Sequence, residues 1–168
     1  MSHSGVLAGL YAGNFAVEIS TNNTTWTAVS NANVKIDDVE LNRPSGEAFV
    51  GGSSDYATIT VGKREPVEIT LTFLYNEDTN SAVNTIFDQF QSTSPRLGVR
   101  WSPRGLVSQA RAYATSNDGG TTTGLGVITN VTLSALDPSD ADPYVAMVTV
   151  RTPSLRRYTL GNSPTDLS

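Results

Sequence analysis

The sequence contains no cysteine, and its single histidine is His3. Disulfide bonds and thiolate metal sites are therefore excluded. Ser–His and Cys–His catalytic pairs need a histidine in the folded site, and we expect His3 to lie outside the folded core. Gly119-Gly120 is not followed by the lysine and helix of a phosphate-binding loop. We therefore expect a protein that is not an enzyme, with no catalytic residue, no cofactor and no metal site.

Charged residues are also scarce. They make up 16% of the chain, against about a quarter in an ordinary soluble domain, and the net charge is −5. A negative balance argues against a DNA-binding surface that works by releasing counterions. The sequence lacks an apolar run of the roughly 18 residues that a membrane span needs, and Met1 to Ser4 carry no basic signal region. We expect a protein that is made and used without secretion and without a membrane.

Alternation of apolar and polar residues predicts a mainly β protein. The clearest strand covers Val67 to Tyr75, in which Ile69, Leu71, Phe73 and Tyr75 share one face. Further strands are expected at 15–19, 25–29, 34–41, 97–101, 108–115, 127–133 and 143–152.

Two local signals refine this pattern. Val34 and Ile36 share one parity, whereas Val39 and Leu41 share the other. An extra residue at Asp37-Asp38, forming a β-bulge, would produce this switch, and so would two short strands separated by a kink. The Asp-Gly pair within 116–121 is typical of a tight hairpin turn, here between the strands at 108–115 and 127–133.

One helix is expected, from Ser81 to Gln91. Its apolar residues recur at the spacing of one helical face. Asp78 or Asn80 could cap its first backbone N–H groups. The apolar stripe consists of Val83, Ile86, Phe87 and Phe90.

Three segments fall outside these elements: an N-terminal arm at 1–14, a long loop at 42–56 and a polar C-terminal tail at 153–168. A loop of this length inside a compact domain is uncommon and is usually functional or disordered. Residues 47–50 could form a short strand within an extended hairpin. We treat residues 1–168 as a single domain.

Two acidic clusters allow more than one interpretation. Asp137, Asp140 and Asp142 could bind a hard cation such as calcium, but the prolines around them favour a stiff turn. The cluster formed by Asp37, Asp38 and Glu40 is either a solvated strand face or a lining that repels phosphate groups.

The order of elements resembles that of the tail tube (major tail) proteins of long-tailed bacteriophages, which are related to the needle tube of type VI secretion. The resemblance rests on pattern and order over about residues 15–152. The segments that carry it are Val34-Lys-Ile-Asp-Asp-Val-Glu-Leu41, the long loop, Val67-Glu-Ile-Thr-Leu-Thr-Phe73, Ala82-Val-Asn-Thr-Ile-Phe-Asp-Gln-Phe90, Leu97-Gly-Val-Arg-Trp101 and Val145-Ala-Met-Val-Thr-Val150.

The resemblance implies an antiparallel two-sheet β-sandwich or barrel with one flanking helix, a long inserted loop and extended terminal arms. It also implies a structural virion protein, located in the tail and assembled in the host cytoplasm. Copies would form six-membered rings whose inner sheets join into a barrel. The rings would stack through the loop and the arms. Double-stranded DNA would pass through the lumen without specific binding, and the partners would be further copies and other tail proteins.

On this interpretation, Asp37, Asp38 and Glu40 are candidates for the lumen. A basic stretch would serve poorly there, so we expect it outside the lumen or at subunit contacts; it comprises Arg96, Arg100, Arg104 and Arg111. The loop residues expected at contacts between subunits are Arg43, Phe49, Gly51, Gly52 and Asp55.

Two other classes remain open. A β-sandwich carbohydrate-binding module, or a fibre or decoration module, would be monomeric in dilute solution and would carry an aromatic patch. Trp26 and Trp101 could stack on a sugar or a nucleic-acid base, although large aromatics in strands are more often core residues. An enzyme is the third class, and the missing histidine and cysteine chemistry argues against it.

Overall fold

The structure is a computed structural model that describes residues 13–52, 56–139 and 141–168. In these ranges eleven strands and one helix follow one another along the chain. In chain order they are β1 (Ala16–Ser20), β2 (Thr27–Val29), β3 (Val34–Glu40), β4 (Ser45–Phe49), β5 (Thr58–Val61), β6 (Val67–Leu74), α1 (Ala82–Gln91), β7 (Arg96–Ser102), β8 (Arg111–Ser116), β9 (Gly126–Leu133), β10 (Val145–Thr152) and β11 (Ser154–Thr159).

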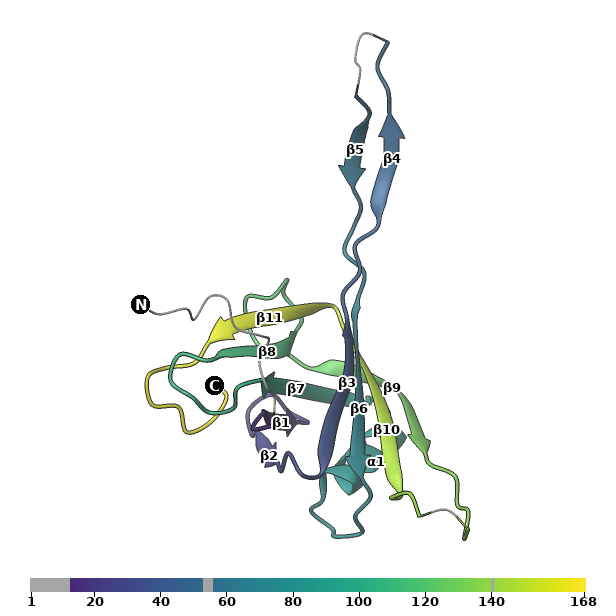
Figure 1. Cartoon of the computed structure of the whole chain (residues 1–168), viewed down its shortest axis with the longest axis vertical. Helices are drawn as coiled ribbons and strands as arrows, with labels where there is room; N and C mark the ends of the chain where they lie inside the picture. The colour runs from purple at the N-terminus through teal and green to yellow at the C-terminus, as the bar shows by residue number, and fades with distance from the viewer. Residues whose placement is uncertain (1–12, 53–55, 140) are drawn as a thin grey trace, which may run out of the picture.

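The strands of the main body form two antiparallel layers (Figure 1). The first, which we call sheet A, has the order β2-β1-β7-β8-β11. The second, sheet B, has the order β3-β6-β10-β9. The two layers meet where the start of β7 pairs with the start of β9, at Arg96–Val127 and Leu97–Gly126. The sheet is not closed into a barrel, so the predicted mainly β, two-sheet fold with one helix is confirmed as an open sandwich.

Side-chain alternation places the core between the layers. In β6, Ile69 and Leu71 are buried and lie opposite Val150 and Val148 of β10. Burying one such side chain stabilises a fold by roughly 1.5–3 kcal/mol. The prediction for this strand is confirmed, except that β6 ends at Leu74, before the exposed Tyr75.

The parity switch in β3 is a β-bulge. The pairing with β6 shifts between Ile36, which lies opposite Leu71, and Asp38, which lies opposite Thr70. Asp37 is the extra residue, and its carboxylate accepts a hydrogen bond from the Thr72 hydroxyl. The bulge returns Val39 to the inner face, so the bulge interpretation is correct and the kink is not needed.

Helix α1 matches the predicted segment, but its cap and its apolar stripe differ from the expectation. Ser81 is the N-cap: its hydroxyl accepts a hydrogen bond from the Asn84 N–H at 3.2 Å. Asp78 and Asn80 do not fill this role. Ile86 is buried, whereas Phe90 is 39% exposed, so the stripe reaches the core only over its first part.

The predicted hairpin at Asp118-Gly119 is wrong at the level of strand pairing. The local turn forms, with left-handed φ values of 80° at Gly119 and 96° at Gly120. However, β8 pairs with β7 and β11, and β9 pairs with β10 and β7. The turn therefore carries the chain from sheet A to sheet B and does not join two neighbouring strands.

The predicted polar tail at 153–168 is part of the fold. Strand β11 pairs with β8 over its whole length. Beyond it the chain folds back, and Leu167, at 0% exposure, packs in a cluster with Leu160 and the alanines 110 and 112. The described residues of the predicted N-terminal arm are 13 and 14, and the rest of the arm lies outside the described residues. No helix in the described ranges combines the length and hydropathy of a membrane-spanning segment.

Candidate assembly surfaces

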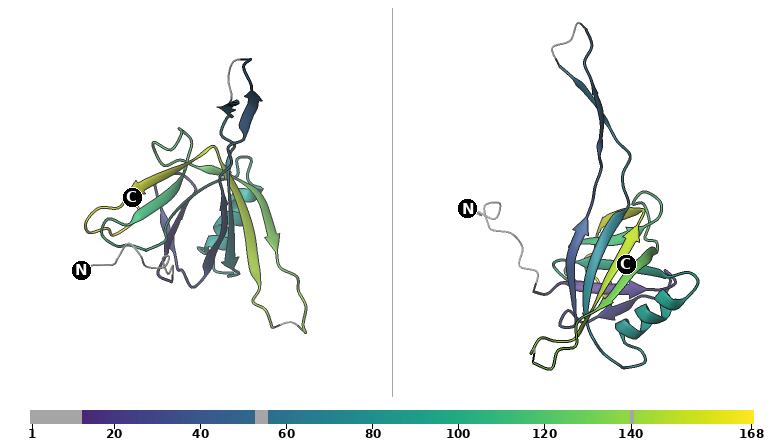
Figure 2. Two further views of the ribbon diagram at one scale, coloured as in Figure 1. Left: turned by 45° about the horizontal axis from the view of Figure 1, so that its top comes forward. Right: turned by 90° about the vertical axis from the view of Figure 1, so that its right-hand side faces the viewer.

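The segment predicted as a long loop is a β-hairpin that projects from one end of sheet B (Figure 2). Within the described part of the chain, strands β4 and β5 pair only with each other, with Phe49 opposite Thr58 and Ala48 opposite Ile59. The short strand expected at 47–50 is therefore confirmed as part of an extended hairpin. The second strand lies beyond the predicted end of the loop at residue 56. Its β-branched run, Thr-Ile-Thr-Val at 58–61, was a signal that could have identified it.

Backbone hydrogen bonds between the segment that enters the hairpin and the segment that leaves it fix the foot of the hairpin. The Gly62 N–H donates to the Pro44 carbonyl at 2.8 Å, and the Glu65 N–H donates to the Asn42 carbonyl at 3.0 Å. A Cβ on Gly62 would lie 2.1 Å from the Pro44 oxygen, so this close approach requires glycine. Arg43 Nε donates to the Gly62 carbonyl at 3.1 Å. The hairpin therefore leaves the body in a defined direction.

The arm above this foot carries apolar side chains in water. Phe49 is 72% exposed and Val61 is 70% exposed, on opposite strands of the hairpin. Isolated two-stranded hairpins are marginally stable, and exposed apolar patches of this kind mark interaction sites. The exposed apolar set of the hairpin comprises Phe49, Val50, Tyr56, Ile59 and Val61.

The structure places the predicted contact residues at different heights along this arm. Arg43 is at the foot, Phe49 ends β4, and Gly51 and Gly52 follow toward the tip. Asp55 lies outside the described residues. Sequence reasoning missed Ile59 and Val61, which belong to β5.

The face of sheet B that points away from the core is open and mostly polar. Strand register places Glu40 opposite Glu68, and Glu68 opposite Arg151. Asp37, Asp38 and Glu40 are all exposed on β3, the edge strand. The charged side chains of β3, β6 and β10 on this face are Lys35, Asp37, Asp38, Glu40, Glu68 and Arg151, four acids against two bases.

The corresponding outer face of sheet A is covered by the chain itself. The Leu167 N–H donates to the Glu18 carboxylate at 2.8 Å, and the Tyr158 hydroxyl donates to the Leu167 carbonyl. Burial raises the pKa of Tyr158. Arg100 belongs to this covered face, where it is buried and pairs with Glu18. It is therefore not available for a contact between subunits, and its expected place outside the lumen stays a prediction. Arg96, Arg104 and Arg111 are exposed.

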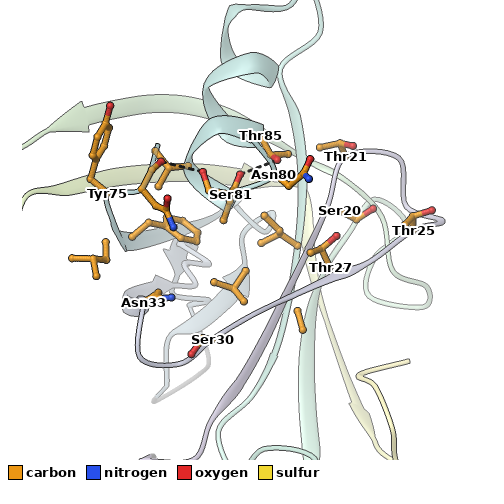
Figure 3. A pocket seen from close by; sticks show the side chains of 18 of the residues that line it. Ser20, Thr21, Thr25, Thr27, Ser30, Asn33, Tyr75, Asn80, Ser81 and Thr85 are labelled. Atoms are coloured by element: carbon orange, nitrogen blue, oxygen red, sulfur yellow. Dashed lines mark hydrogen bonds between the residues drawn. The ribbon is translucent and has the colours of Figure 1, made fainter. Parts of the chain in front are cut away.

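A cavity of about 480 Å³ lies where the β1–β2 hairpin, the end of β6 and the start of α1 meet (Figure 3). Hydroxyl and amide side chains point into it, among them Ser20, Thr27, Asn33 and Asn80. In the wall of this cavity, Ser81 Oγ donates a hydrogen bond of 3.1 Å to the Asn76 carbonyl oxygen. None of its lining residues carries a carboxylate, an imidazole or an amine. This surface can form hydrogen bonds with an uncharged polypeptide segment, but it offers no strong general base.

The turn interpretation of the acidic segment after β9 is supported by local bonding. The Asp137 carboxylate accepts from the Ser139 N–H at 3.0 Å and from its hydroxyl at 2.8 Å, and these bonds lower the pKa of Asp137. Asp140 lies outside the described residues, and among the described residues no group of three potential ligands gathers.

The tryptophans are not exposed on a shared platform. Trp101 is buried in the core and stacks on Tyr113, with the ring centroids 5.7 Å apart. Trp26 is half-buried beneath the Arg100 guanidinium, which lies 4.3 Å from its ring centroid. The core interpretation of Trp101 is therefore correct.

Neither a family model nor a curated protein matches this sequence. Solved structures do match. A chain of the anti-feeding prophage baseplate aligns with a TM-score of 0.68 and 12% identity, over 93% of this chain and 98% of that chain. A chain of the PVC sheath–tube complex, an extracellular contractile injection system, aligns with a TM-score of 0.63 and 14% identity, over 95% of this chain and 99% of that chain. The SPP1 tail tube aligns with a TM-score of 0.59 and 8% identity, over 92% of this chain and 81% of that chain.

At these identities the similarity shows the fold, and it extends over nearly the whole chain. It agrees with the element order on which the resemblance rested. The chain has the tail-tube fold that phage tails and contractile injection systems share.

Proposed function

We propose that this chain is a structural protein that assembles into stacked six-membered rings and forms a tail tube. The hairpin β4–β5 is the observation that carries the proposal. It exposes Phe49, Ile59 and Val61 on an arm that reaches away from its own core, where the described residues of the body do not cover them, so a contact with another copy would remove them from water. The six-fold symmetrised baseplate that contains a similar chain supports the number six.

Sheet B is the layer that we place around the lumen. Its outer face is open, whereas the C-terminal segment covers the outer face of sheet A. Its two edges are β3 and the far part of β9, and pairing β3 of one copy with β9 of the next would remove both edges. A head-to-tail contact of this type closes into a ring when the rotation permits.

In such a ring Asp37, Asp38 and Glu40 would face the channel, as would Glu68. The excess of acids on this face would repel phosphate groups, so DNA could move through the lumen without being held. The tube would then act as a conduit for DNA ejection in a virion tail, assembled in the host cytoplasm with other tail proteins.

The test combines imaging with a shortened hairpin. Negative-stain microscopy and sedimentation of the purified protein should show rings or tubes that form as the concentration rises. Replacing residues 46–60 with an Asn-Gly turn keeps the hydrogen-bonded foot. This variant should melt at the temperature of the wild-type subunit but should no longer form tubes. Wild-type protein that stays monomeric over a wide concentration range would contradict the proposal. Normal tubes from the shortened variant would remove the hairpin from the interface.

A carbohydrate-binding or decoration module is the second candidate, and the exposed aromatic side chains bear on it. Phe49 and Tyr56 lie on the hairpin, Tyr75 follows β6 and Phe90 lies in the last turn of α1. Sugar platforms need neighbouring rings on one face. Here Tyr75 meets Tyr144 edge to face, with the ring centroids 4.9 Å apart, and the other exposed rings are divided between the hairpin and α1. A monomer that binds polysaccharide in a pull-down experiment would favour this candidate over the tube.

A further inference from the structure

The two ends of sheet B differ in charge. The foot of the hairpin, in segments 41–44 and 62–66, carries Arg43, Lys63 and Arg64 against a single acid, Glu65. At the other end are the connections 75–81 and 134–144. The charged residues in these two stretches of sequence are all acidic, with neither lysine nor arginine. Strand register places these segments at opposite ends of the sheet, and Figures 1 and 2 show the same arrangement.

A notch of about 300 Å³ opens at the basic end. Its apolar walls come from Leu41, Val67 and Leu155, and the side chains of Arg43 and Arg64 stand beside them. Arg43 is oriented by its bond to the Gly62 carbonyl, and Glu65 is held by the Asn42 amide at 2.7 Å. The notch is therefore a formed recess with apolar walls, lined in addition by two guanidinium groups and by the Glu65 carboxylate, which the Asn42 amide holds.

A matching knob stands at the acidic end. Leu136 is 81% exposed at the start of the β9–β10 connection, and Asp137 follows it. The Ser139 hydrogen bonds hold the Asp137 carboxylate in a tight turn next to this leucine. An apolar side chain and a negative charge are thus presented side by side.

Resting on the tube function proposed above, we propose that the Leu136–Asp137 knob of one copy docks into the Arg43–Arg64 notch of a copy in the adjacent ring. The leucine would be covered by Leu41, Val67 and Leu155, and the carboxylate would meet the guanidinium groups. Because knob and notch lie at opposite ends of the subunit, the contact is heterologous and repeats from ring to ring. It fixes the polarity of the stack, since two like ends would place like charges together.

Charge reversal tests this pairing. Arg64→Glu and Asp137→Lys should each form rings but fail to stack at concentrations at which the wild-type protein is fully stacked, by microscopy and sedimentation. Mixing the two variants should restore stacking, since alternating rings then meet only opposite charges. The double variant Arg64→Glu/Asp137→Lys should also stack. Arg157→Glu and Asp88→Lys, which change exposed charges on β11 and α1, should stack like the wild type.

Each other outcome overturns a specific claim. If the single variants stack normally, the notch is not the receptor, and the tube function stands. If the single variants fail and neither the mixture nor the double variant recovers, the two charges do not meet and the pairing is wrong. If the wild-type protein forms neither rings nor stacks, the proposed function fails, and the docking fails with it.

Discussion

Glu18 and Arg100 form a buried ion pair between directly opposite residues of β1 and β7. Arg100 donates to Glu18 Oε1 from Nη2 at 2.7 Å and from Nε at 3.1 Å. The second carboxylate oxygen accepts the Leu167 N–H, and Trp26 covers the guanidinium. Both charges are satisfied by groups that the C-terminal segment and the β1–β2 hairpin bring to them.

Removing one member of this pair should be costly, because the other remains buried and uncompensated. We expect Glu18→Ala to lower the free energy of unfolding by about 3–5 kcal/mol in urea titrations. Glu68→Ala, an exposed change of the same kind in β6, should shift it by less than about 0.5 kcal/mol. Equal urea midpoints for the two variants would contradict this prediction, because they would show that leaving Arg100 without its partner does not destabilise the fold.

Leu167 should behave as a core residue despite its place near the end of the chain. Leu167→Ala is expected to cost about 2–5 kcal/mol of unfolding free energy, the usual range for a buried leucine. Leu136→Ala is the matched exposed control and should leave the isolated subunit unchanged. Thermal melts of the monomer measure both. A wild-type melting temperature for Leu167→Ala would mean that the C-terminal segment does not hold this position in solution.

The two phenylalanines of α1 should differ. Phe87 is half-buried and packs against the core, so Phe87→Ala should cost roughly 1.5–3 kcal/mol of subunit stability. Phe90→Ala should cost less than about 1 kcal/mol, since its ring is substantially exposed. Differential scanning calorimetry distinguishes them. If Phe90→Ala proved the more damaging change, the helix would pack differently from this structure.

Asp118 should make stability depend on pH. Its carboxylate accepts hydrogen bonds from Thr122, Ser116 and Thr121, and these bonds hold its pKa well below the usual range. A lowered folded-state pKa stabilises the fold above the unfolded-state pKa, and this contribution is lost as the pH falls below about 4. Asp118→Asn should therefore melt earlier than the wild type at pH 7, and the difference should shrink toward pH 2. A difference that stays constant with pH would exclude the ionised carboxylate as its cause.

Much of the fold was predictable because it depends on local patterns. The period-two alternation in β6 decides which face is buried, and the parity switch at Asp37-Asp38 reports a bulge wherever both flanking segments bury the same face. The 3.6-residue spacing of Val83 and Ile86 identifies α1 in the same way. These signals depend on the side chains of one segment and do not require knowledge of its neighbour.

The partner of each strand was decided only by the tertiary structure. Alternation shows which residues of a strand face inward. It does not show which strand lies beside it, because backbone hydrogen bonds can form between any two strands whatever their side chains. The turn at Asp118-Gly119 therefore could not show that β8 and β9 belong to different sheets. The polar tail gave no apolar period, because Leu160 and Leu167 are single anchors. They are buried on a surface that β1 and β8 form from distant parts of the chain. The same holds for the knob and the notch: the sequence contains Leu136 and Arg64, and the antiparallel course of sheet B sets them at opposite ends of one subunit.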